Sequence, residues 1–118
     1  MNVGEVIKAL RAIPCKRVEL VTVIGTKSVI TGFSSVGSWW NSDDKACLFR
    51  GNKHDKSFLL HYLEQFLTQE CQEQTYYYTP EHTLYIEGYA GYYSGCHKII
   101  SVKYIQEKDT IQILNFEK

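Results

Sequence analysis

Hydrophobic positions near the N-terminus recur at the spacing of a helix. One apolar stripe is formed by Val3, Val6, Ile7, Leu10 and Ile13. Asn2 can cap this helix, and Glu5 stands three positions later, as a capping box requires. Pro14 has no backbone donor and clashes with the preceding turn, so we predict that the helix runs from about Val3 to Ala12.

A second helical pattern lies in the middle of the chain and begins at Asp55 or Ser57. Its core-facing stripe consists of Leu59, Tyr62, Leu63, Phe66 and Leu67. Polar residues over 68–74 close it. We expect both helices to pack against strands.

The remaining apolar segments predict β-structure. Residues 17–24 and 28–33 form an expected hairpin. The first of them does not alternate cleanly, which suggests either a strand covered on both faces or a strand whose register the pattern does not reveal. Further expected strands cover residues 45–50, 83–87, 98–106 and 110–116, with 76–78 as a candidate addition. Residues 34–44 are expected to be a loop.

This element order predicts an α+β fold. We expect a mostly antiparallel sheet of about five to six strands, with two helices packed on one face. The length of 118 residues suits a single domain covering residues 1–118, and the chain shows no internal repeat or linker.

Composition and charge exclude several classes. Hydrophobic residues make up 44% and charged residues 22%, which is typical of a globular protein. Thirteen basic and thirteen acidic residues give zero formal charge, which disfavours direct nucleic-acid binding. A basic cluster near the end of the first helix is explained by the helix dipole; it comprises Lys8, Arg11, Lys16 and Arg17. No apolar run suits a membrane span and no signal-peptide pattern opens the chain, so we expect a cytoplasmic protein without membrane association.

Cysteine and histidine positions do not predict an enzyme. Cys15, Cys47, Cys71 and Cys96 are widely spaced, so we interpret them as reduced thiols that pack as small hydrophobes. His97 adjoins Cys96, but neighbouring strand residues point to opposite faces, which places this histidine badly for activating the thiol. The chain has no metal-ligand spacing, phosphate loop or dinucleotide motif, and we predict no catalytic residue, metal or cofactor.

Two aromatic segments are candidate recognition loops. Residues 88–95 consist almost entirely of tyrosine, glycine and serine, and Trp39 and Trp40 stand side by side in a polar segment. Such compositions are typical of binding surfaces, although the same rings could instead pack against the sheet or cover the core. The candidate partner-binding residues are Trp39, Trp40, Tyr89, Tyr92, Tyr93 and Ser94.

The chain resembles small bacteriophage-encoded accessory proteins. The likeness lies in the opening helix, Val3 to Leu10, in Ile13-Pro14, in the serine–glycine–tryptophan segment at 34–40 and in the tyrosine–glycine segment at 88–93. This chain lacks the arginine of the family's first loop and has Ala90 where a glycine is expected. The resemblance implies phage origin and an accessory protein that acts by binding.

Three functional hypotheses follow from these features. The first is a non-enzymatic inhibitor of a host defence complex, of anti-CRISPR or similar type, which binds a host protein complex in the host cytoplasm through its aromatic loops. The second is a sponge or enzyme for a cyclic nucleotide signal, with tyrosine stacking and with Lys98 or Lys103 neutralising phosphate. The third is a structural component that self-assembles as a homo-oligomer through its tyrosine-rich edge.

Overall fold

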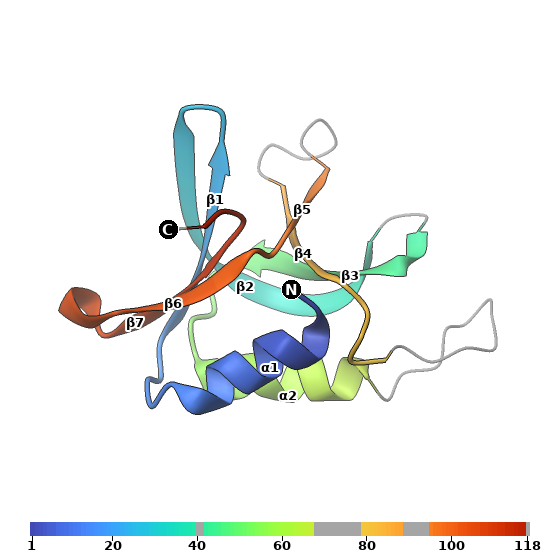
Figure 1. Cartoon of the computed structure of the whole chain (residues 1–118), viewed down its shortest axis with the longest axis horizontal. Coiled ribbons are helices and arrows are strands. Elements are labelled where there is room, and N and C mark those ends of the chain that lie inside the picture. The colour runs from blue at the N-terminus through green and yellow to red at the C-terminus, as the bar shows by residue number, and fades with distance from the viewer. Residues whose placement is uncertain (40–41, 68–78, 89–94, 118) are drawn as a thin grey trace.

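A curled mixed sheet and two helices form the molecule (Figure 1). The computed structural model describes residues 1–39, 42–67, 79–88 and 95–117. The helices are α1 (Val3–Ala12) and α2 (Lys56–Phe66). The strands are β1 (Val18–Ile24), β2 (Lys27–Trp39), β3 (Ser42–Gly51), β4 (Leu84–Glu87), β5 (Cys96–Lys98), β6 (Ser101–Ile105) and β7 (Thr110–Leu114).

Both helices form where the apolar patterns predicted them. In α1 the Asn2 side chain accepts the Glu5 backbone N–H at 2.8 Å, and the Glu5 carboxylate accepts the Asn2 N–H at 2.9 Å, which completes the capping box. Asp55 caps α2 by accepting the Ser57 N–H at 2.8 Å. The helices lie side by side beneath the curved sheet (Figure 1), and Arg11 of α1 forms an ion pair with Glu64 of α2.

The sheet is mixed rather than mostly antiparallel, and it has more strands than expected. Seven strands from the described residues follow the order β5-β4-β3-β2-β1-β7-β6. β1 pairs in parallel with β7, and β3 pairs in parallel with β4, while the other neighbours are antiparallel. The α+β class with two helices is confirmed. The antiparallel prediction fails at two places because both parallel pairs join segments that are distant in sequence.

Strand lengths also differ from the prediction. Residues 34–44 were expected to be a loop, yet β2 continues to Trp39 and β3 begins at Ser42. Cross-strand hydrogen bonding overrides the weak strand propensity of serine and glycine here, and β-bulges accommodate the irregular register. The expected strand at 98–106 is divided into β5 and β6 by Ile99 and Ile100. The candidate strand at 76–78 lies outside the described residues.

The centre of the sheet explains the irregular pattern of β1. Residues 18–22 are all buried, as expected for a strand covered on both faces. The pairing of β1 with β2 ends at Leu20 and Thr31. Past this pair, Lys53 and His54, which follow β3, lie between the two strands. Lys53 exchanges two backbone hydrogen bonds of 2.9 Å with Phe33, and the Val18 N–H donates to the His54 carbonyl at 2.7 Å. Gly32 is required at this crossing, since a Cβ there would lie 2.3 Å from the Lys53 carbonyl oxygen.

The hydrophobic core lies between the helices and one face of the sheet. The largest fully buried side chains are Phe33, Phe66, Leu10, Leu20, Leu48, Leu59, Leu63, Leu84, Ile86, Ile99, Ile111 and Ile113. Within the described ranges, neither helix is long and apolar enough to cross a membrane.

Candidate functional site

One end of the core-facing sheet surface is polar. Cross-strand partners share a face, and the pairs Leu20–Thr31 and Phe33–Arg50 therefore place Thr31 and Arg50 on the same face as the core. Thr22 follows Leu20 on this face, two residues along β1. At this end of the sheet, the core-facing side chains of three neighbouring strands are therefore polar instead of apolar. They are Thr22, Thr31 and Arg50, and we call them the Arg50 cluster.

Arg50 ties the cluster together by donating to oxygens on three other strands. Its Nε donates to the Glu87 backbone carbonyl at 2.7 Å, and its Nη1 donates to Thr31 Oγ1 at 2.9 Å. Its Nη2 donates to Thr22 Oγ1, and Thr22 is fully buried. The guanidinium is therefore fixed across β1, β2 and β4 by neutral acceptors. A guanidinium has five N–H donors, so two remain without an acceptor among the described residues.

The charge of Arg50 is only partly compensated. The Glu87 carboxylate accepts the Arg50 backbone N–H at 3.0 Å rather than the guanidinium. Burial lowers the pKa of Arg50, and the opposing attraction of Glu87 is the smaller effect. No described carboxylate lies within 4.0 Å of a guanidinium nitrogen of Arg50. A fixed cation with unused donors is suited to an anionic oxygen group, because guanidinium binds carboxylate and phosphate well.

His97 borders this cluster from β5. It pairs with Ile86 and so lies on the core-facing side of the sheet. Its Nε2 atom is buried and has no hydrogen-bond partner in the described part of the chain. Burial lowers the pKa of His97, and the charge of Arg50 lowers it further. The ring is therefore neutral at pH 7, and its Nε2 is a second polar group without a described partner.

Two of the cysteines, Cys47 and Cys96, are disfavoured as nucleophiles. Cys15 and Cys47 are buried free thiols, as predicted, whereas Cys71 lies outside the described residues. Burial strongly raises the pKa of Cys47 and also raises the pKa of Cys96, which disfavours both thiolates. Cys96 pairs with Glu87 and His97 pairs with Ile86, so the two neighbours face opposite sides of the sheet.

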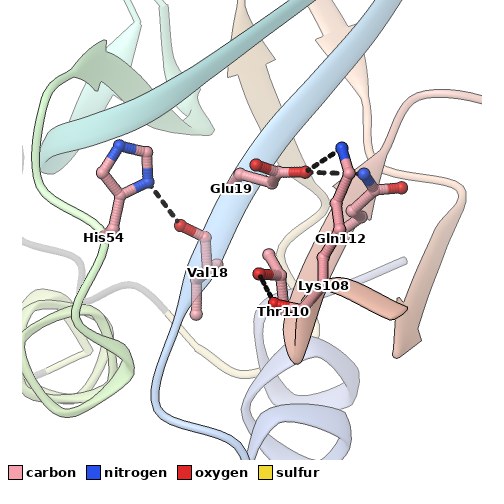
Figure 2. Close-up of polar contacts among 6 residues, drawn as sticks. All are labelled: Val18, Glu19, His54, Lys108, Thr110 and Gln112. Carbon is pink, nitrogen blue, oxygen red and sulfur yellow. Dashed lines mark hydrogen bonds and ion pairs between the residues drawn. The ribbon is translucent and has the colours of Figure 1, made fainter. Parts of the chain in front are cut away.

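A second polar cluster, centred on Glu19, lies between β1 and β7 (Figure 2). Gln112, the register partner of Glu19, donates from Nε2 to Glu19 Oε1 at 2.6 Å, and both side chains are buried. Lys108 Nζ lies 3.9 Å from the same oxygen. In the same view His54 Nδ1 donates to the Val18 carbonyl at 2.9 Å, which fixes the imidazole against β1. The carboxylate thus has a hydrogen-bond donor and a nearby opposite charge within the chain.

The candidate partner-binding residues cannot be placed. Trp40, Tyr89, Tyr92, Tyr93 and Ser94 lie outside the described residues, as does the side chain of Trp39. The flanking residues are described. Trp39 pairs with Ser42 at the start of β3, whereas Gly88 and Gly95 are joined by a 2.8 Å backbone hydrogen bond beyond the end of β4. Because β3 and β4 are parallel, the flanks of the two aromatic segments lie at opposite ends of this strand pair.

Sequence patterns did not reveal the Arg50 cluster. Arg50 stood only as the last residue of an expected short strand, and no motif connects it with Thr22 or Thr31. The one local signal was the position of Arg50, two residues after the apolar Leu48 on the same strand. Alternate strand residues share a face, so this spacing places a charge on the buried face. In the chain as described, no group of three or more histidine, cysteine, aspartate or glutamate side chains is arranged to hold a metal ion.

Comparisons with known proteins returned no relative. No family model, curated protein or solved structure matches this chain.

Proposed function

We propose that this chain is a non-enzymatic binding protein, and that its partner presents an anionic oxygen group, a carboxylate or a phosphate, to Arg50. The observation that carries the proposal is the set of three neutral oxygens that hold the guanidinium. They fix its position without cancelling its charge. The raised thiol pKa values of Cys47 and Cys96 support a binding role over a cysteine-dependent reaction.

The bacteriophage origin and the inhibition of a host defence complex remain predictions from the family resemblance. An acidic or phosphate-bearing surface on a host complex would satisfy the Arg50 cluster. Trp39 and Tyr92 should be replaced by alanine separately, because the flanks of their segments lie at opposite ends of β3 and β4. Loss of partner capture by one variant alone would identify the binding end.

Thermal unfolding in the presence of simple anions tests the proposal directly. Phosphate, acetate and chloride are compared at equal ionic strength. At roughly ten times its dissociation constant an anion stabilises the folded state by about 1.4 kcal/mol, which raises the melting temperature by several degrees. We expect this stabilisation with phosphate or acetate but not with chloride.

Two substitutions and a matched control decide whether Arg50 is responsible. Arg50→Met should abolish the anion-dependent shift, and Arg50→Lys should reduce it, because lysine keeps the charge but loses the planar fork. Arg11→Met removes one exposed guanidinium from α1 and should leave the shift unchanged. An equal shift in the Arg50→Lys, Arg50→Met and wild-type proteins would overturn the proposal, as would the absence of any shift in the wild type.

A further inference from the structure

A layered group of aromatic rings joins the core to the surface of α2. Phe33 is fully buried, and Tyr62 meets it edge to face, with ring centroids 6.1 Å apart and an interplanar angle of 80°. Phe58 stacks on Tyr62 at 6.5 Å and 29°. Phe58 is itself 53% exposed, the largest value among the exposed large hydrophobic residues of the described chain. The Phe58 ring is thus packed against Tyr62 and also exposed to solvent.

A lysine ammonium is fixed beside these rings. Lys53 Nζ donates to the Tyr62 hydroxyl at 3.0 Å and lies 5.2 Å from the centre of the Tyr62 ring, within the range of a cation–π contact. It also lies 3.4 Å from the Ser34 carbonyl. All these partners are neutral, and no described carboxylate lies within 4.0 Å of the ammonium. Its backbone is held by the paired hydrogen bonds to Phe33.

We propose that this surface, formed by Phe58, Tyr62 and Lys53, binds a nucleobase that carries a phosphate. The base would stack on the open face of Phe58, and the phosphate would contact the Lys53 ammonium. Stacked aromatic rings beside fixed cations are the common features of sites for single-stranded nucleic acid and nucleotides. His61 adds a further exposed ring, with its centroid 6.2 Å from that of Tyr62.

The zero net charge of the chain favours a short binding site over an extended one. A protein that binds nucleic acid mainly through phosphates needs a basic excess, and this chain has none. Stacking provides affinity that does not depend on net charge. We therefore expect a short site for one or two nucleotides, with a shallow salt dependence, rather than an extended electrostatic groove.

Fluorescence anisotropy with labelled oligothymidylate tests the proposal at low salt, and unlabelled thymidine monophosphate serves as competitor. Phe58→Leu keeps an apolar side chain without the ring and should weaken binding about tenfold, which is the loss of one stacked base. Lys53→Met should weaken binding and flatten its salt dependence. Ile30→Ala changes a comparably exposed residue, 50% against 53%, on the β1–β2 hairpin and should have no effect.

The outcomes separate the two sources of the ligand. Competition by the mononucleotide at comparable concentration supports a nucleotide site, whereas binding of the oligomer alone supports a nucleic-acid strand. Wild-type protein that binds neither, or Phe58→Leu protein that binds as well as wild type, overturns the proposal. The two proposals fail separately: we expect Arg50→Met to retain oligothymidylate binding and Phe58→Leu to retain the phosphate-dependent thermal shift.

Discussion

Arg50, which is half-buried, and Glu19, which is buried, are both charged residues on strands of the sheet, but their surroundings differ. Glu19 accepts a hydrogen bond from its register partner Gln112 and faces the Lys108 ammonium, so the chain supplies both a donor and an opposite charge (Figure 2). Arg50 has three hydrogen-bond acceptors, but no described carboxylate contacts its guanidinium.

This difference separates a structural charge from one suited to a partner. On folding, the Glu19 carboxylate gains a hydrogen-bond donor in Gln112 and an opposite charge nearby in Lys108. The Arg50 guanidinium is partly desolvated, and burial lowers its pKa more than the attraction of Glu87 raises it. An anionic ligand would supply the missing compensation, and this is the reason for assigning binding to Arg50 rather than to Glu19.

The largest expected loss of folding stability follows from a substitution beside Glu19. Gln112→Leu leaves the buried Glu19 carboxylate without its hydrogen-bond donor and should destabilise the protein by about 3 kcal/mol in urea unfolding. Gln106→Leu, an exposed glutamine in the short 3₁₀ helix Gln106–Lys108, is the control and should change stability little. Equal effects of the two substitutions would show that Glu19 does not depend on Gln112.

A smaller loss of folding stability is expected when Arg50 is replaced. Arg50→Met breaks three hydrogen bonds but also removes a partly desolvated cation, so we expect a cost of only about 1 kcal/mol in the same assay. The same variant should lose all stabilisation by phosphate. A destabilisation as large as that of Gln112→Leu would contradict the comparison, because it would mean that Arg50 is fully compensated within the chain.

The smallest effect concerns pH. The pKa of His97 is lowered in the folded state, so the unfolded chain takes up this proton more readily as the pH falls below the ordinary histidine value of about 6.5. Stability should therefore rise with pH from the folded-state pKa up to that value. His97→Gln should flatten this slope in urea unfolding series, with His61→Gln on the exposed face of α2 as the matched control. An unchanged slope in the His97 variant would rule out this contribution.

Local patterns were sufficient for the helices and most strands. The 3.6-residue spacing of Val3, Val6, Ile7 and Leu10, with Asn2 and Glu5 as capping residues, determined α1 to the residue. The absence of alternation in residues 17–24 left two interpretations open, and the structure shows the one in which the strand is covered on both faces, over residues 18–22. The burial of Cys15 and Cys47 also followed from the chemistry of free cysteine.

Pairing between distant segments was beyond the reach of these patterns. Nothing local indicates that Val18 would lie beside Ile111, or Ala46 beside Leu84, yet these parallel pairs set the strand order. The same reason hides the candidate site, since Thr22, Thr31 and Arg50 meet only after β1, β2 and β3 align. The sequence by itself determined where helices and strands form, because their apolar spacing acts over a few residues. Only the tertiary structure decided which polar side chains meet, because that depends on register between strands far apart along the chain.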